Sequence, residues 1–395
     1  MENSQGVFVS IMLDGKTMPV GRLWCYRRKG RESASFEYNS EWLNNPDRFA
    51  IEPALSLTEG LHYTDKALFG ALGDSAPDRW GRTLIQHANI GKNLSELDYL
   101  LGVDDETRQG ALRFSTEADG PYLKETSETT NPPLVKLEEL LSISAKVLEN
   151  RETKEELKII LNPGSSLGGA RPKAAVVDKT GCYAIAKFPG KDDSIDVVRW
   201  EAVALTLAKS AGINVPEFRL ENIAGKPVLI IKRFDREKSR RIPFISAMSM
   251  LGAQDNEDNY SFVDIAYILY KYGSQPDKDC SELWRRMVFG LMIRNTDNHL
   301  RNHGFLYTGK GWILSPVYDL NPDIAGTNFS VSLDSSLQNT PEYAVQLAGK
   351  FRLSSAYAEK ILEEVKAAVA DWRNAAKSFG ISKQNIERMK NTFAC

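Results

Sequence analysis

The sequence predicts an α+β fold in which strands and helices are grouped rather than alternating. Residues 7–12 and 20–27 alternate between apolar and polar side chains, as half-buried strands do. The stretch 162–173 is the richest in glycine and serine, and short strand-like segments follow it. From about residue 261 onward the apolar periodicity is mainly helical. Such segregation is typical of α+β proteins and not of repeated β-α-β units.

The N-terminal region is predicted to begin with a β-hairpin. Its strands, 7–12 and 20–27, are separated by the turn D-G-K, and residues 34–38 are expected to form a third strand.

A helix is predicted to start near Pro77 and to run to about Ala88, because proline is favoured in a first helical turn. Asp74 or Ser75 is its expected cap, and a further helix is predicted near 98–102.

A polar, proline-bearing segment at 118–133 is the best candidate for a linker. Helical periodicity resumes at 134–149. The later predicted elements are strands at 174–178, 183–188, 216–222 and 227–234, and helices at 198–211, 261–272, 280–295, 355–374 and 382–391.

Composition sets limits on the class of protein. The chain has 395 residues with 42% hydrophobic and 26% charged side chains, enough for two or three globular domains. A formal net charge of −2 gives no global positive field for nucleic acid. The most apolar short run, 288–293, is far below bilayer length, and the N-terminus lacks the pattern of a signal peptide. Four scattered cysteines without C-x-x-C predict a reduced, cytoplasmic protein without membrane contact.

The Gly-rich stretch G-S-S-L-G-G-A, Gly164–Ala170, is able to approach phosphate groups closely because glycine has no Cβ. It is neither a Walker A motif nor G-x-G-x-x-G, and taken alone a surface turn is the simpler interpretation. Lys187 ends an apolar strand soon after it, and Glu201 on the next predicted helix is a candidate partner. The alternative is a strand-end lysine that extends its ammonium to solvent.

Asp297 and Asn302 keep the spacing D-x-x-x-x-N, and Asp319 follows an apolar, strand-like segment. In phosphoryl transfer such an aspartate contacts the acceptor hydroxyl, while the asparagine and a second aspartate hold Mg²⁺. His299 is either a positive group near the transferred phosphate or a structural residue. With His303 it has the i,i+4 spacing of a helical metal site, but the polar surroundings favour a loop.

In its motifs the chain resembles the HipA family of serine/threonine kinases, the toxin components of bacterial toxin–antitoxin modules. The stretches that carry the resemblance are L-G-D-S-A-P-D-R-W-G-R (72–82), S-S-L-G-G-A-R-P-K-A (165–174), V-L-I-I-K-R-F-D-R (228–236), N-T-D-N-H-L-R-N-H-G-F (295–305) and L-S-P-V-Y-D-L (314–320).

The resemblance implies a bilobal, protein-kinase-like fold with an all-helical C-terminal lobe and ATP bound between the lobes. The implied segments are a β-rich N-terminal subdomain with helices (1–117), the linker (118–133), an ATP-binding N-lobe core (134–236) and a helical C-lobe (237–395).

The resemblance also assigns roles to individual residues. Asp297 is the implied catalytic aspartate, and Asn302 and Asp319 are the implied Mg²⁺ ligands. The implied ATP contacts are Lys187 and the hinge residues Lys232, Arg233 and Phe234. The residues of the Gly-rich loop, Ser166, Leu167, Gly168, Gly169 and Ala170, are further candidates, as is His299 if it is not structural. Ser166, or alternatively Ser165, is the implied autophosphorylation site, and its phosphorylation would disable ATP binding.

Partners are implied in the same way. They are a protein substrate such as an aminoacyl-tRNA synthetase, a small helix-turn-helix antitoxin, and operator DNA reached only through that antitoxin. One departure is Arg171-Pro172-Lys173, where some family members carry Gln-Glu before the lysine, so loop motion is expected to differ. A small-molecule or lipid kinase and a catalytically silent corepressor remain alternative interpretations.

Overall fold

The computed structural model describes residues 3–118, 120–122, 136–164, 169–178, 180–191, 193–238, 240–254, 257, 259–326, 328–336 and 338–393. The chain forms two compact units. Unit 1 consists of residues 1–191 and 223–245, and unit 2 of residues 192–222 and 246–395. The bounds of the four predicted segments stay predictions. Most of the predicted linker lies outside the described residues.

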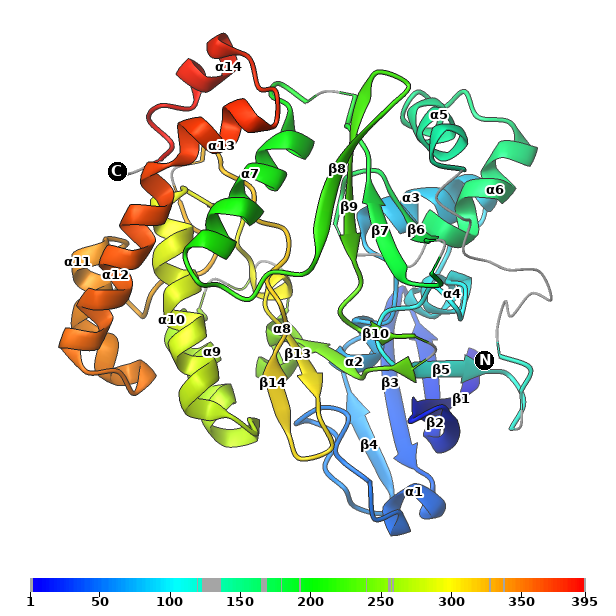
Figure 1. Cartoon of the computed structure of the whole chain (residues 1–395). Coiled ribbons are helices and arrows are strands. Elements are labelled where there is room, and N and C mark those ends of the chain that lie inside the picture. The colour runs from blue at the N-terminus through cyan, green and yellow to red at the C-terminus, as the bar shows by residue number, and fades with distance from the viewer. Residues whose placement is uncertain are drawn as a thin grey trace. The chain divides into compact units, whose positions relative to one another are not determined.

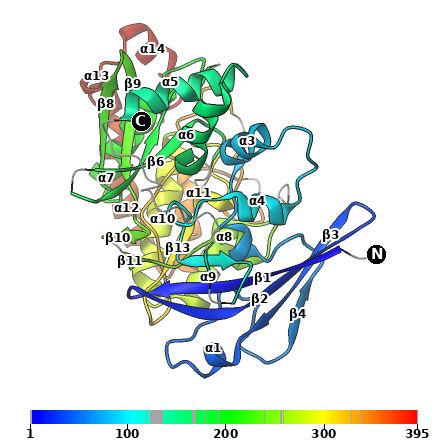
Figure 2. The ribbon, with the colours of Figure 1, turned by 90° about the vertical axis from the view of Figure 1, so that its right-hand side faces the viewer.

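Unit 1 begins with a five-stranded antiparallel sheet in the order β4-β3-β2-β1-β5 (Figures 1 and 2). The strands are β1 (Asn3–Leu13), β2 (Lys16–Arg28), β3 (Arg31–Tyr38), β4 (Leu61–Thr64) and β5 (Leu112–Ser115). The predicted hairpin and third strand are confirmed. Asp14 and Gly15 both have positive φ, 49° and 78°, as the tight turn between β1 and β2 requires.

Two strands, β4 and β5, have no counterpart among the predicted elements. Each has only four residues, and β5 pairs with β1, which is distant in sequence. A short segment with a distant partner carries little local signal.

Four short helices follow in unit 1: α1 (Ser40–Asn44), α2 (Gly70–Gly73), α3 (Arg79–Ala88) and α4 (Glu96–Gly102). The predicted helix is confirmed as α3, but its expected cap is wrong. Asp78 occupies the N-cap position without a side-chain capping bond, whereas Asp74 is the C-cap of α2. Pro77 therefore precedes the helix, and the prediction that it lies in the first turn is wrong.

A second sheet in unit 1 includes the antiparallel strands β6 (Lys173–Val177), β7 (Tyr183–Lys187) and β9 (Lys226–Lys232), with β7 in the middle. The helices α5 (Leu137–Leu148), α6 (Lys154–Gly164) and α3 cover one face of it. The core between them includes Trp80, Leu84, Leu140, Ile160, Ala174, Val176, Ala186, Val228 and Ile230. Since side chains alternate along a strand, Ala175, Ile185 and Lys187 lie on the opposite face.

The hairpin β10 (Arg236–Glu237) and β11 (Arg240–Arg241) completes unit 1. The strands β8 (Phe218–Ile223) and β12 (Phe244–Ser246) straddle the division of the chain into units.

Unit 2 is mainly helical. Its elements are α7 (Val197–Ser210), α8 (Ala247–Leu251), α9 (Phe262–Tyr272), α10 (Pro276–Met292), the 3₁₀ turn η2 (Leu300–Asn302), β13 (Gly304–Tyr307), β14 (Trp312–Leu314), α11 (Pro341–Gln346), the 3₁₀ turn η3 (Ala348–Phe351), α12 (Ser355–Ala370), α13 (Trp372–Ser378) and α14 (Lys383–Arg388). The expected all-helical lobe therefore needs a correction, because β13 and β14 pair as a hairpin. Among the described residues no helix is long and apolar enough to cross a membrane.

Candidate active site

A short polar loop in unit 2 carries the predicted catalytic aspartate. The helix α10 ends at Met292, and Arg294 turns the chain with a positive φ of 51°. The N–H of Asn295 donates to the carbonyl of Gly290 at 2.9 Å, which fixes the start of the loop. Asp297 then lies exposed, where a carboxylate is accessible to a substrate hydroxyl.

Asn302 closes this loop. Its Nδ2 donates to the backbone carbonyl of Asp297 at 3.1 Å, and its N–H donates to the carbonyl of His299 at 2.8 Å. Because the Nδ2 group of Asn302 donates within the loop, its side chain is held in one orientation. Its Oδ1 is then the atom suited to bind a hard cation. The predicted pair Asp297 and Asn302 is thus brought together.

Asp319 has a backbone conformation that is unusual for a residue with a side chain. Its φ is 54°, in the left-handed region that disfavours most L-residues. Tyr318, directly before it, donates its hydroxyl to the carbonyl of Arg301 at 2.7 Å. This bond joins the segment of Asp319 to the loop that contains Asn302.

The donors at this loop fit Mg²⁺ better than a structural metal. No group of three or more His, Cys, Asp or Glu side chains able to hold a metal occurs in the described part of the chain. One amide and one carboxylate match Mg²⁺, which commonly takes one or two protein carboxylates and completes its shell with water and substrate phosphates.

The two histidines of the loop do not form a zinc site. His303 is buried and packs edge-on against Phe262, with ring centroids 5.1 Å apart. Burial, helped by the charges of Arg286 and His299, lowers the pKa of His303 to about 3. His303 is therefore a neutral core residue, and the predicted role of His299 at ATP stays a prediction.

Unit 1 carries the predicted phosphate-contacting lysine. Lys187 ends β7 and lies directly opposite Lys173 of β6, so both point to the sheet face away from α3, α5 and α6. Glu201 is 3% exposed on α7 of unit 2, and its pairing with Lys187 stays a prediction.

The side chain of Arg233, a residue of the predicted hinge, is buried in unit 1 and makes its contacts there. Its guanidinium pairs with Asp235 at 2.7 Å and donates to the carbonyls of Thr107 and Arg108 at 2.7 and 3.1 Å. Its backbone N–H donates to the carbonyl of Tyr183 at 2.9 Å. An adenine contact of Arg233 would therefore have to use its carbonyl.

The other two hinge residues differ from Arg233. Lys232 is exposed and lies opposite Ala184, on the sheet face that does not carry Lys187. Phe234 packs near Phe244, with ring centroids 6.3 Å apart. A contact of Lys232 with a nucleotide on the face of Lys187 would therefore involve its backbone.

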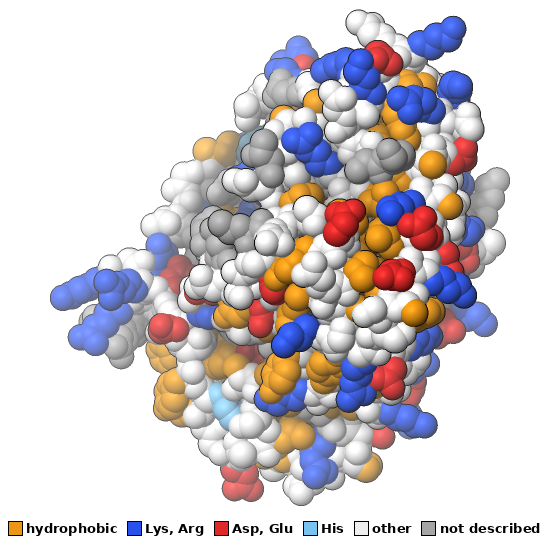
Figure 3. Space-filling model, turned by 90° about the vertical axis from the view of Figure 1, so that its left-hand side faces the viewer, with side chains coloured by type: hydrophobic (Ala, Val, Ile, Leu, Met, Phe, Trp, Pro, Cys, Tyr) orange, Lys and Arg blue, Asp and Glu red, His pale blue; other side chains and the backbone are white. Residues whose placement is uncertain are grey.

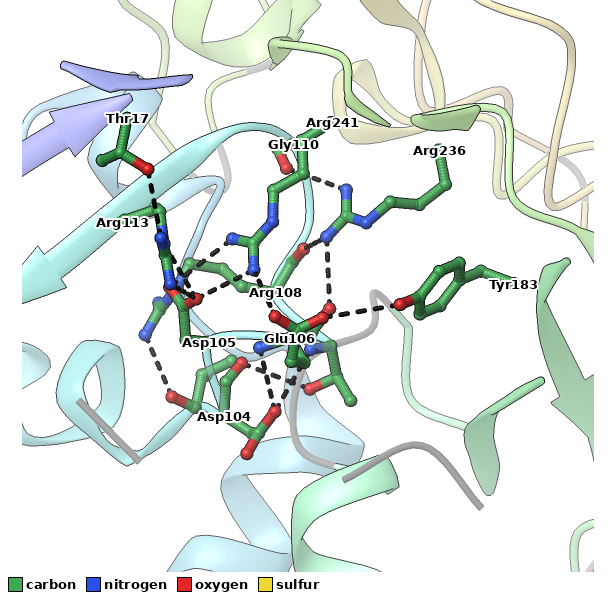
Figure 4. Close-up of polar contacts among 12 residues, drawn as sticks. Thr17, Asp104, Asp105, Glu106, Arg108, Gly110, Arg113, Tyr183, Arg236 and Arg241 are labelled. Atoms are coloured by element: carbon green, nitrogen blue, oxygen red, sulfur yellow. Dashed lines mark hydrogen bonds and ion pairs between the residues drawn. The ribbon is translucent and has the colours of Figure 1, made fainter. Parts of the chain in front are cut away.

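Arg233 and Asp235 belong to a larger buried cluster of charges in unit 1, part of which Figure 4 shows. Asp105 pairs with Arg113 at 2.7 Å and with Arg241 at 2.8 Å. Asp235 also pairs with Arg236 at 2.9 Å.

The Gly-rich loop is only partly described. Ser165, Ser166, Leu167 and Gly168 lie outside the described residues, so their predicted roles stay predictions. Gly169, with a φ of 94°, and Ala170 are described. The N–H of Gly169 donates to the carboxylate of Asp78, a contact that the sequence analysis did not predict although the motif 72–82 contains this aspartate.

Two models of protein families match the chain. Residues 165–372, more than half of the chain, match the model described as the HipA-like C-terminal domain. Residues 10–115 match the model described as the HipA N-terminal domain. This chain belongs to the HipA family.

Curated relatives match only in part. "Putative kinase Y4mE" of Sinorhizobium fredii (strain NBRC 101917 / NGR234) is 24% identical over 214 residues, which are 52% of this chain and 44% of that protein. A "Putative kinase" of Haemophilus influenzae (strain ATCC 51907 / DSM 11121 / KW20 / Rd) is 27% identical over 226 residues, 47% of this chain and 65% of the relative. This HipA-family chain thus spans less than two thirds of the length of either relative.

A solved structure shares the fold. HipA in the toxin–antitoxin complex of Shewanella oneidensis MR-1 HipA, HipB and operator DNA has a TM-score of 0.69 and 17% sequence identity. The match covers 97% of this HipA-family chain and 94% of that chain. The predicted α+β, HipA-like fold class, with a β-rich N-terminal part and a more helical C-terminal part, is confirmed.

Proposed function

We propose that this HipA-family chain is an ATP- and Mg²⁺-dependent serine/threonine protein kinase. The observation that carries the proposal is the hydrogen bonding of one loop. Asn302 donates to the carbonyl of Asp297 at 3.1 Å, and the hydroxyl of Tyr318, beside Asp319, donates to the carbonyl of Arg301 at 2.7 Å. An exposed carboxylate, an oriented amide oxygen and a second carboxylate on a segment that is hydrogen-bonded to the same loop fit the needs of phosphoryl transfer.

In the proposed reaction the acceptor hydroxyl oxygen attacks the γ-phosphorus of ATP and the bond to ADP breaks. Asp297 orients the hydroxyl and receives its proton. Lys187 contributes a positive charge to the phosphates. Asn302 and Asp319 would hold Mg²⁺, which neutralises phosphate charge when it is bound.

We further propose that the chain is the toxin of a toxin–antitoxin pair. The Shewanella HipA is described in a complex with HipB and operator DNA. By analogy, a small helix-turn-helix antitoxin is the proposed partner, and DNA is reached only through it. In support, basic and acidic side chains are intermixed on the face shown in Figure 3, and the net charge is −2.

The proposed substrate is a component of translation, such as an aminoacyl-tRNA synthetase, on the basis of the family resemblance. The proposed brake is autophosphorylation of Ser166 or Ser165. A phosphate there adds about −1.5 to −2 charges in the Gly-rich loop and would repel ATP phosphates.

The decisive variant is Asp297→Gln, compared with Asp277→Asn, which removes an exposed carboxylate elsewhere in unit 2. We expect phosphoryl transfer to fall by about 10²–10⁴-fold in Asp297→Gln, the range typical of a lost general base. Binding of an ATP analogue with Mg²⁺ should stay close to wild type. Mass spectrometry should find phosphate on Ser165 or Ser166 of the wild type and of Asp277→Asn, but not of Asp297→Gln.

Other outcomes separate the alternatives. Undiminished transfer by Asp297→Gln contradicts the role of this aspartate. Labelling of metabolites or lipids, rather than proteins, in a lysate would identify a small-molecule or lipid kinase. A wild type that binds no Mg-ATP would favour a silent corepressor.

A further inference from the structure

The start of α3 holds the chain on both sides of the Gly-rich loop. The residues concerned are Asp78, at the N-cap position of α3, and Trp80, in its first turn. Neither has a role in the proposed phosphoryl transfer. Both lie in the region that matches the HipA N-terminal domain, whereas the loop belongs to the region that matches the C-terminal domain.

Near the end of the loop, Gly169 is held through both of its peptide groups. Its N–H donates to the carboxylate of Asp78. Its carbonyl accepts the backbone N–H of Trp80 at 3.3 Å. The indole Nε1 of Trp80 donates to the carbonyl of Lys173 at 3.0 Å, so the first residue of β6 is held as well.

At the start of the loop, the chain packs against the same helix. Gly164 is the last residue of α6, and a Cβ built on it would lie 2.6 Å from Cδ1 of Leu84 and 3.3 Å from Nε1 of Trp80. A Cβ here would force the side chain of Leu84 to shift, so the glycine lets the chain approach α3 closely. Trp80 is only 2% exposed and offers a rigid surface.

A carboxylate at a loop that is expected to receive phosphates needs an explanation, because like charges repel. If Asp78 only competed with phosphate for the N–H of Gly169, no other bond between the start of α3 and this segment would be needed. The simultaneous bonds from Trp80 to the carbonyls of Gly169 and Lys173 favour an anchor that fixes the orientation of the peptide groups instead.

We propose that Asp78 and Trp80 are positioning residues that fix the end of the Gly-rich loop and thereby set the affinity of the protein for ATP. The proposal rests on the proposed kinase function. It also means that the HipA N-terminal domain region is part of the nucleotide-binding machinery.

The test compares Asp78→Ala, Asp78→Asn and Trp80→Phe with the wild type in the full-length chain. Asp65→Asn is the matched control, because Asp65 is an exposed carboxylate of the same unit. Three quantities are measured: hydrogen–deuterium exchange of a peptide that contains Gly169, the Kd of a non-hydrolysable ATP analogue with Mg²⁺, and the melting temperature.

Loss of a charge-assisted hydrogen bond typically weakens an equilibrium about tenfold or more. We therefore expect Asp78→Ala to exchange faster at Gly169 and to raise the Kd about tenfold, with little change in melting temperature. Asp78→Asn keeps an acceptor and should be intermediate. Trp80→Phe loses only the bond to Lys173 and should have a smaller effect, and Asp65→Asn none.

Three results would overturn the proposal. Faster exchange with an unchanged Kd would show that the anchor does not set affinity, and unchanged exchange would show that there is no anchor. A lower Kd in Asp78→Ala would identify Asp78 as a competitor of phosphate. If the wild type binds no nucleotide, the proposed kinase function fails, and with it the role in affinity, whereas exchange at Gly169 still decides whether Asp78 is an anchor.

Discussion

Glu52 is a carboxylic acid in an environment that its sequence neighbours do not reveal. It is 3% exposed in unit 1, and its carboxyl accepts the backbone N–H of Ala71. Burial raises the pKa of Glu52 to about 7; the bond from Ala71 opposes this shift, and nearby Asp74 adds to it. A protonated, neutral carboxyl is therefore the form that the fold prefers.

A pH-dependent stability follows for Glu52. Because the pKa of Glu52 in the folded protein lies above its ordinary value of 4.5, its contribution to stability is fully present below pH 4.5 and is lost as the pH rises through about 7. Glu52→Gln keeps an acceptor without the charge. We measure the free energy of unfolding in urea. From pH 5 to pH 8 that of Glu52→Gln should rise by roughly 2 kcal/mol relative to that of the wild type, since one pKa unit corresponds to about 1.4 kcal/mol. A difference in unfolding free energy that does not change with pH would contradict the prediction.

Among the elements, the loop that carries Asp297 and the segment after Asp319 are hydrogen-bonded to each other in unit 2. Thr296 donates its hydroxyl to Asp323 at 2.5 Å, and its carbonyl accepts the N–H of Ser330 at 2.9 Å. Arg294 donates through Nε to the carbonyl of Gly326 at 2.8 Å. The loop that carries Asp297 is thus braced by a second segment over several residues.

Gly326 is the tightest point of this brace. A Cβ at Gly326 would lie 2.0 Å from Oγ1 of Thr296 and 2.2 Å from the Asp323 carboxylate. Gly326→Ala should therefore displace the loop that carries Asp297 and destabilise unit 2 by about 1–3 kcal/mol, as overpacking does. If Asp297 has its proposed role, phosphoryl transfer should fall as well. Gly349→Ala, where a Cβ would meet nothing within 4 Å, is the control. Equal activity and melting temperature in both variants would show that the brace does not position the loop.

Across the whole chain, segments far apart in sequence are joined by buried charges. In unit 1, Asp105 is 1% exposed and pairs with Arg113 and Arg241, while Asp235 pairs with Arg233 and Arg236 (Figure 4 shows part of the cluster). The N–H of Gly110 donates to Asp235 at 2.8 Å. Residues 105–113 near the first sheet are thereby held to residues 233–241 after β9.

Breaking this cluster should be costly. Burial would raise the pKa of Asp105, but the charges and hydrogen bonds of Arg241 and Arg113 outweigh it and hold the pKa below its usual range. Asp105→Asn leaves buried guanidinium groups uncompensated and should destabilise unit 1 by about 3–5 kcal/mol in denaturant unfolding. For the wild type, the contribution of Asp105 is present above its unfolded pKa and is lost as the pH falls.

The control for Asp105 is Asp14→Asn. Asp14 pairs with Arg240 at 2.7 Å, but both side chains are more than half exposed. We expect Asp14→Asn to lower the free energy of unfolding by only about 0–1 kcal/mol. Similar losses in the two variants would contradict a special role for the buried cluster.

The sequence by itself determined the features that depend on local pattern. Period-2 alternation and the turn at Asp14 and Gly15 predicted the hairpin β1–β2, and the spacing of Asp297 and Asn302 predicted a loop in which the structure bonds them together. These predictions hold because strand alternation, turn chemistry and a loop of fixed length are properties of a few consecutive residues.

Only the tertiary structure decided the partners of residues whose contacts come from distant segments. Arg233 was predicted as a hinge residue, yet its guanidinium bonds Thr107 and Arg108, which no local pattern indicates. Asp78 was not predicted as a cap, and its carboxylate accepts the N–H of Gly169 from beyond the predicted linker. Buried polar groups require partners wherever the fold brings them, and which partners those are is fixed by packing rather than by sequence spacing.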